Sequence, residues 1–233
     1  MEAYAYQRAD TQVQVNSFIQ SVYNWMGAGL GITGILAFFV AHSSLIQILG
    51  NPIILIGLVI AELGIVFYLS ARVDRMEAST ATGLFILYSA LNGVTLAPIF
   101  IIYTASSIAS TFFICAGTFV ACSIYGMVTQ RDLTSMGSFF FMGLIGIVIA
   151  SLVNMFLRSP MIAAIISYIG VFIFVGLTAY DTQKLKMMAI TQPDGLDAAV
   201  VRKGSIIGAL TLYLDFINMF IFMLQIFGIG ADD

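Results

Sequence analysis

Seven long apolar stretches dominate this chain and limit what it can fold into. Each has about 20 residues, the length that an α-helix needs to cross a bilayer core of about 30 Å. They lie at residues 20–41, 52–71, 82–103, 107–128, 136–157, 161–181 and 204–227. Overall, 60% of the residues are hydrophobic and 9% are charged, whereas an average soluble domain has about 25% charged residues. The sequence therefore predicts an integral membrane protein.

A helical bundle fits these stretches better than a membrane β-barrel. Both folds satisfy every backbone hydrogen bond in lipid, but barrel strands alternate apolar and polar residues over about ten positions. The stretches here are apolar on all sides, so we expect an all-α bundle of seven transmembrane helices at residues 20–228. Residues 1–19 would form a short cytoplasmic tail, 182–203 a cytoplasmic connection and 229–233 an acidic C-terminal tail. The polar residues 1–17 lack the pattern of a cleaved signal peptide, so we expect the first span to be kept.

The basic residues are distributed unevenly between the two sides of such a bundle. Only Arg158 falls on one side. The N-terminal tail and the second, fourth and sixth connections hold the other eight: Arg8, Arg72, Arg75, Arg131, Lys184, Lys186, Arg202 and Lys203. Because basic residues collect on the cytoplasmic side, the N-terminus is predicted to be cytoplasmic and the C-terminus to lie outside.

Several acids occupy or border the apolar stretches. Asp215 lies well inside the last one, where an ionisable side chain costs about 2.5–3.5 kcal/mol, so it is a functional-site candidate. Asp181 closes the preceding stretch, where Lys184 at i+3 offers an ordinary helix-surface pair. Glu62 lies mid-way along the second stretch, and Arg72 marks its cytoplasmic end, a common place for a topology anchor. A purely structural role, hydrogen bonding between helices, is the alternative for each acid.

Two buried carboxyl groups brought together would form a pH-sensitive contact. They resist double ionisation and are expected to share one proton. As the pH rises this proton leaves, the like charges repel, and the contact between the sixth and seventh spans weakens. Measured from the outer ends of their helices, however, Asp181 and Asp215 differ in depth by about 10 Å. The sequence alone therefore does not establish that they touch.

The segments around these acids resemble the signature of the Bax-inhibitor family of membrane proteins. Residues 176–183 read Gly-Leu-Thr-Ala-Tyr-Asp-Thr-Gln, and residues 209–218 read Ala-Leu-Thr-Leu-Tyr-Leu-Asp-Phe-Ile-Asn. Residues 61–72 and 91–100 are also similar, so the resemblance covers spans two to seven. The segment that joins the two aspartate helices is longer here than in compact bacterial members.

The resemblance implies six helices around a central seventh and a pH-sensitive calcium leak. The short tails and loops favour a bacterial source, so we expect the protein in a bacterial inner membrane. It implies that Asp181 and Asp215 are the pH sensor, that Arg72 is a basic gating partner, and that Glu62 lies on the ion pathway. Calcium prefers six to eight oxygen ligands. Asp181 and Asp215 would therefore bind calcium only transiently, as a pathway for the ion requires.

Two other functions remain open beside a leak channel. A proton-coupled calcium transporter would use the same acids, but it predicts a repeat of helix triplets that is not visible here. A non-conducting regulator would bind another membrane protein, such as a protease or a cell-death factor. The expected partners are the lipid bilayer, calcium ions and protons, with a membrane protein as a further possibility. No cofactor is expected, and no basic tract predicts nucleic-acid binding.

Enzymatic and metal-centre functions fit the sequence poorly, so we expect a protein that is not an enzyme. His42 is the only histidine, and Cys115 and Cys122 lie about 10 Å apart along one helix face, too far for a disulfide. A retinal receptor would need a lysine in the last span, and residues 204–227 contain none. An intramembrane aspartyl protease would have Gly-Leu-Gly-Asp at its second acid, whereas Leu-Tyr-Leu precedes Asp215.

Overall fold

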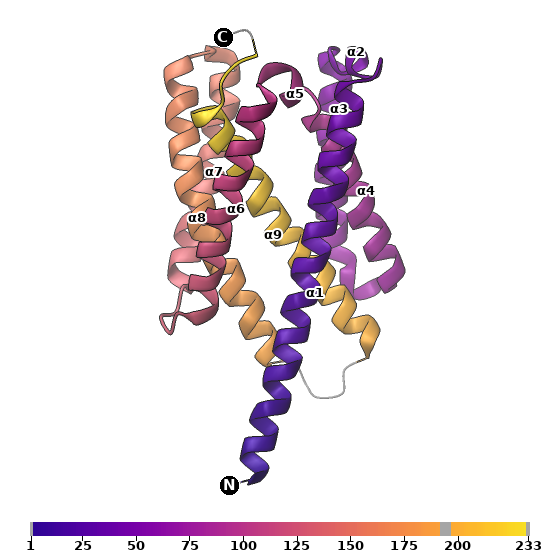
Figure 1. The fold of residues 1–233 in the computed structure, drawn as a ribbon, viewed down its shortest axis with the longest axis vertical. Helices are drawn as coiled ribbons and strands as arrows, with labels where there is room; N and C mark the ends of the chain where they lie inside the picture. Colours follow the sequence, from indigo (N-terminus) through magenta and orange to yellow (C-terminus); the bar gives the residue numbers. More distant parts are fainter. Residues whose placement is uncertain (1, 192–196, 232–233) are drawn as a thin grey trace. The chain divides into compact units, whose positions relative to one another are not determined.

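A computed structural model describes residues 2–191 and 197–231, with side chains from residue 14 onward, and is almost entirely helical (Figure 1). The long helices are α1 (Glu2–Ala41), α3 (Pro52–Arg72), α4 (Ala78–Leu96), α6 (Ala105–Val128), α7 (Thr134–Leu157), α8 (Pro160–Thr191) and α9 (Ala198–Phe227). Short helices α2 (Ile46–Leu49), η1 (Val73–Arg75) and α5 (Ile99–Ile102) lie between them.

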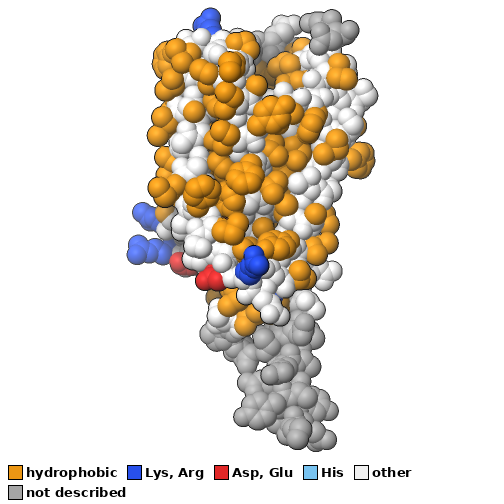
Figure 2. Space-filling model, turned by 90° about the vertical axis from the view of Figure 1, so that its left-hand side faces the viewer, with side chains coloured by type: hydrophobic (Ala, Val, Ile, Leu, Met, Phe, Trp, Pro, Cys, Tyr) orange, Lys and Arg blue, Asp and Glu red, His pale blue; other side chains and the backbone are white. Residues whose placement is uncertain are grey.

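Seven helices of the described chain are long and apolar enough to cross a membrane. This confirms the predicted all-α membrane bundle. Many of their large apolar side chains are exposed, as contact with lipid requires. Figure 2 shows one such face, which is largely hydrophobic and has most of its charged side chains near one border.

Several helices extend beyond the predicted spans. Helix α1 begins at Glu2, so residues 2–19 of the predicted N-terminal tail are helical. Helix α8 continues to Thr191 and α9 begins at Ala198, so most of the predicted connection at 182–203 is helical. The predicted turn at 193–195 lies outside the described residues, as do Asp232 and Asp233 of the acidic tail.

The chain divides into two compact units. Unit 1 comprises Met1–Ile102 and Met187–Tyr213, and unit 2 comprises Tyr103–Lys186 and Leu214–Asp233. The first half of α9 thus belongs to unit 1 and its second half to unit 2. The most apolar part of α9 is 67% buried, against 11–39% for the other six spans. This high burial agrees with the expectation that other helices surround the seventh span.

In unit 2, two glycines let α7 and α8 approach each other closely. A Cβ atom on Gly137 of α7 would lie 2.5 Å from the ring of Tyr180 on α8. A Cβ atom on Gly176 of α8 would clash with the ring of Phe140 on α7. Small residues at such positions are typical of helix contacts in membranes. They set the position of the α8 turn that bears Asp181.

The beginning of α7 is stabilised by an acid in the α6–α7 connection. The carboxylate of Asp132 accepts hydrogen bonds from the Thr134 hydroxyl (2.6 Å) and the Thr134 backbone N–H (2.9 Å). These two bonds hold the pKa of Asp132 below its ordinary value. The connection thereby acquires a fixed geometry beside the turn of α8 that contains Asp181 and Gln183.

Candidate functional site

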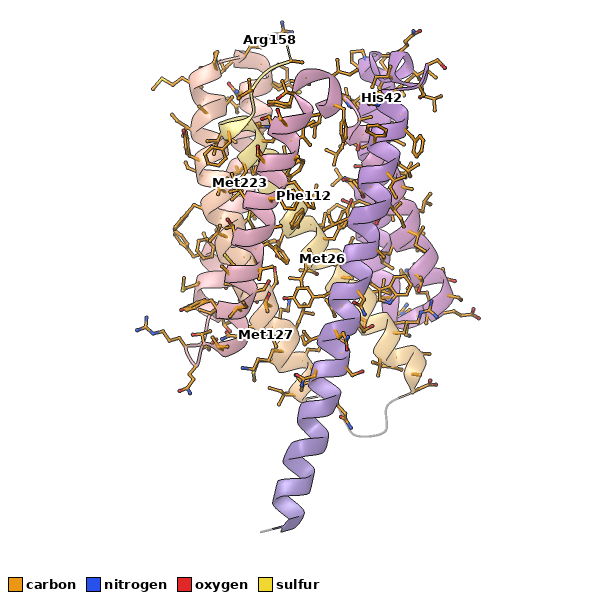
Figure 3. The ribbon with its side chains drawn as sticks, viewed as in Figure 1. Met26, His42, Phe112, Met127, Arg158 and Met223 are labelled. Atoms are coloured by element: carbon orange, nitrogen blue, oxygen red, sulfur yellow. The ribbon has the colours of Figure 1, made fainter. Side chains whose placement is uncertain are left out.

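Hydrogen bonds fix the turn of α8 that contains Asp181 against the neighbouring connection of unit 2. The side chain of Gln183 accepts from the backbone N–H of Leu133 (2.9 Å) and donates to the backbone carbonyl of Arg131 (2.8 Å). The ammonium group of Lys186 donates to the carbonyl of Met127 at the end of α6 (2.6 Å), a residue labelled in Figure 3. Asp181 is therefore held in place from both the connection and α6.

Aromatic packing fixes the position of Asp215 on α9. The ring of the next residue, Phe216, lies 5.5 Å from the rings of Phe112 and Phe119 on α6, with edge-on geometry in both pairs. The thiol of Cys115 lies between these two positions on α6 and donates weakly to the carbonyl of Phe216 (3.8 Å). Asp215 itself is only 4% exposed. The α6–α9 contact therefore fixes the turn of α9 that carries the buried carboxyl group of Asp215.

The structure brings Asp181 and Asp215 together, with a hydrogen bond between their side chains. Because an ionised carboxylate has no donor, such a bond requires a proton on one of the two groups. The Oδ2 atom of Asp215 is fully buried and has no hydrogen-bond partner among the described residues. Lys184, exposed one turn later on α8, is near enough to interact electrostatically with Asp181.

The depth difference expected from the sequence does not separate the two acids. In Figure 1, α9 runs obliquely past α6 and α8. Residues at different distances along two tilted helices can therefore meet where the helices cross. The tilt is a property of the packing and could not be taken from the sequence.

Glu62 lies in unit 1 and takes part in a separate polar cluster. It is 8% exposed, and its Oε1 atom accepts a hydrogen bond from the Thr95 hydroxyl (2.8 Å). Its Oε2 atom accepts a longer bond from the side-chain amide of Asn92 (3.5 Å). The two partners come from successive turns of α4. Glu62 therefore contributes buried oxygen atoms to the interface between α3 and α4.

The cluster around Glu62 extends to Tyr213, which the sequence reasoning did not select. The Tyr213 hydroxyl donates to Asn92 Oδ1 (3.1 Å) and lies 2.6 Å from the hydroxyl of Thr33 on α1. The Tyr213 side chain is fully buried. The hydroxyl of a tyrosine deep in an apolar helix needs a hydrogen-bond partner. The position of Tyr213 in the sequence could therefore have indicated that it belongs to a polar cluster.

Arg72, the predicted gating partner, ends α3 in unit 1. Its side chain is exposed and has no hydrogen bond or ion pair with any described residue of that unit. Asp181 and Asp215 belong to unit 2. The pairing of Arg72 with one of these acids stays a prediction.

The described residues offer few other metal-binding groups. They contain no cluster of three or more His, Cys, Asp or Glu side chains that could hold a metal ion. Cys115 and Cys122 are both free thiols. A calcium ion near Asp181 and Asp215 would therefore depend on these two carboxyl groups, backbone carbonyls and water.

Comparison with known proteins places the chain in a family. The family model described as "Inhibitor of apoptosis-promoting Bax1" matches residues 15–232, almost the whole chain. The chain belongs to the Bax-inhibitor family. The resemblance inferred from the aspartate segments is thereby confirmed.

Relatives in the Bax-inhibitor family include several bacterial proteins. The inner membrane protein YbhL of Escherichia coli is 52% identical over 227 residues, which cover 95% of this chain and 97% of YbhL. A protein of Borreliella burgdorferi is 43% identical over 220 residues, 94% of each chain. A protein of Deinococcus radiodurans is 40% identical over 226 residues, 97% of this chain and 96% of the relative. This Bax-inhibitor-family chain thus matches its relatives over nearly their full length.

Proposed function

We propose that this chain is a pH-sensitive calcium leak channel of a bacterial inner membrane, with Asp181 and Asp215 as its sensor and gate. One observation supports the proposal most strongly. Two carboxyl groups of unit 2, on α8 and α9, are hydrogen-bonded to each other, and the one on α9 is buried. This arrangement is a proton-dependent contact between two membrane-spanning helices.

The direction of the pH response follows from the charges. At low pH one proton is shared and the contact joins α8 to α9. When the proton leaves at higher pH, two negative charges face each other. Two unit charges 4 Å apart repel by about 4 kcal/mol at an effective dielectric constant of about 20. That energy corresponds to roughly a thousand-fold change in a two-state equilibrium, so loss of the proton favours separation of the helices and an open path.

The proposed calcium pathway uses weak oxygen sites. Calcium takes six to eight oxygen ligands, and a path must release the ion as well as bind it. Asp181 and Asp215 would contact calcium transiently in their ionised state. Glu62, with its oxygens buried beside Thr95 and Asn92, would line the path within unit 1.

The proposed orientation places the sensor toward the cytoplasm. The positive-inside rule assigns the N-terminus to the cytoplasm and the C-terminus to the outside. Asp181 lies ten residues before the end of α8 at Thr191, the end that this orientation makes cytoplasmic. Arg72, on the same side, would pair with one ionised acid and stabilise the deprotonated state.

Calcium flux into proteoliposomes between pH 6 and 8 tests the proposal. Wild-type flux is expected to rise with pH. Asp181→Asn and Asp215→Asn should each remove most of the pH dependence, because one titrating group of the pair is lost. The double variant should add little beyond either single change. Asp74→Asn is a matched control, because Asp74 is an exposed acid of η1, and it should retain the wild-type profile.

Other outcomes would support the competing functions. Equal and pH-independent flux in all variants, or no flux in any, would overturn the channel proposal and favour a regulator of another membrane protein. Proton counter-flux in a constant ratio to calcium would instead indicate a proton-coupled transporter.

A further inference from the structure

An apolar groove lies between α6, α7 and α8 of unit 2. Its volume is about 390 Å³, within the range of small-molecule sites. Its lining is almost entirely apolar and includes Cys122, Leu133, Phe140, Phe172, Gly176 and Ala179. No part of the described chain fills it.

The groove exists because its floor consists of small residues. Gly176 and Ala179 on α8 and Ala121 on α6 carry no bulky side chain, whereas the rings of Phe140 and Phe172 form a wall. Ala121 and Phe172 are exposed. The groove therefore opens onto the apolar surface that faces lipid.

Basic side chains gather at one end of this groove. Leu133, a lining residue, follows Arg131 by two positions in the connection that Gln183 holds against α8. Lys184 directly follows Gln183 on α8. The ammonium group of Lys186 donates to a carbonyl at the end of α6. Arg131 and Lys184 are exposed.

One acid lies among these basic groups. Asp132 is exposed, and its carboxylate already accepts two hydrogen bonds from Thr134. The three basic side chains outnumber this one acid, so the end of the groove is positive. The Asp181–Asp215 pair is more buried than these groups and is not part of this count. An anionic group at the membrane surface would be attracted there.

We propose that the groove binds one acyl chain of an anionic phospholipid whose phosphate lies against Arg131. The apolar lining suits an acyl chain, and the positive end suits the phosphate. The lipid is already in an apolar solvent, so burial of its chain adds little selectivity. Charge therefore sets the preference for an anionic head group. The bound acyl chain would contact α8 at Ala179, two residues before Asp181.

Lipid retention by the purified full-length protein tests this site. Native mass spectrometry would compare binding of dioleoyl-phosphatidylglycerol and dioleoyl-phosphatidylcholine. Wild type should prefer the anionic lipid by about five-fold, the factor that corresponds to roughly 1 kcal/mol for one basic side chain near an anionic surface. Arg131→Gln should lose this preference. Ala121→Phe, which fills the groove, should lose the bound lipid.

A matched control and a local probe are available in the chain. Ala109→Phe places the same side chain at another exposed position of α6, about 18 Å away along the helix, and should behave as wild type. Cys122 lines the groove, whereas Cys115 is fully buried. In nanodiscs, N-ethylmaleimide should therefore modify Cys122 about five-fold more slowly when phosphatidylglycerol replaces phosphatidylcholine.

Four results would overturn the proposal. The first is equal retention of the two lipids by wild type. The second is an unchanged anionic preference in Arg131→Gln. The third is protection of Cys122 that depends on protein concentration and not on lipid, which would indicate a second copy of the chain in the groove. Protection by glycerol 3-phosphate in the buffer would also contradict it, because a free phosphate would then suffice. None of these results depends on calcium flux, so the lipid site and the channel can fail separately.

Discussion

At the scale of single residues, the buried acids of the two units are accommodated differently. A carboxyl group away from water must be neutral or well hydrogen-bonded. Asp181 and Asp215 are hydrogen-bonded to each other, which requires a proton on one of the two groups. Glu62 instead accepts one short bond from Thr95 and one long bond from Asn92. The hydrogen bond of the aspartate pair thus depends on a proton, whereas those of Glu62 depend on donors from α4.

Removal of the Thr95 hydroxyl should expose this difference. Thr95→Val leaves Glu62 with only the 3.5 Å bond from Asn92. Loss of one hydrogen-bond partner of a buried polar group costs about 1–3 kcal/mol, so the midpoint of thermal unfolding in detergent should fall. Thr118→Val is the control, because Thr118 is half-buried and its hydroxyl bonds only to a carbonyl of its own helix. Equal losses in the two variants would contradict a special role for the Thr95–Glu62 bond.

At the scale of helices, glycines decide how closely α7 and α8 approach. Gly137 faces the ring of Tyr180, the residue directly before Asp181. Gly146, on the same helix, has open space where its Cβ atom would be. The same residue type therefore has a packing role at one position of α7 and none at the other.

Alanine substitutions at these two glycines should have opposite effects. Gly137→Ala would force Tyr180 to move and should destabilise the protein by about 1–3 kcal/mol, the usual cost of overpacking. Gly146→Ala should be neutral or stabilising by up to about 1 kcal/mol, because alanine favours helix. Thermal unfolding monitored by circular dichroism would measure both. A loss in Gly146→Ala as large as in Gly137→Ala would show that the close approach is not the cause.

At the scale of the whole molecule, the uneven placement of basic residues predicts its orientation. The second connection contains Arg72 and Arg75, whereas the first connection, residues 42–51, contains no lysine or arginine. The insertion of seven spans in alternating directions then assigns every other connection to one side.

Cysteine labelling can test this orientation. In a Cys122→Ala background the remaining native thiol, Cys115, is fully buried. Ser44→Cys, exposed in the first connection, should react with a membrane-impermeant maleimide in intact spheroplasts. Ser79→Cys, exposed at the start of α4, should react only after permeabilisation. The reverse pattern would invert the proposed topology and place the aspartate pair near the outer surface.

The sequence alone was sufficient for the class of fold and for the candidate acids. The length and composition of each apolar stretch predicted a membrane helix, because lipid leaves the backbone few alternatives. The depth of Asp215 within such a stretch marked it as unusual, because an isolated charge there is costly. The aspartate segments also placed the chain in its family.

Only the tertiary structure decided how helices end and which side chains meet. The length of an apolar stretch indicates which residues cross the lipid, but not where the helix ends. It therefore did not give the end of α8 at Thr191 or the start of α1 at Glu2. The contact between Asp181 and Asp215 depends on helix tilt and close packing, which involve residues far apart in sequence. The hydrogen bonds of Tyr213 to α1 and α4 have the same origin. Hydropathy is a property of each segment, whereas contact geometry is a property of the packed molecule.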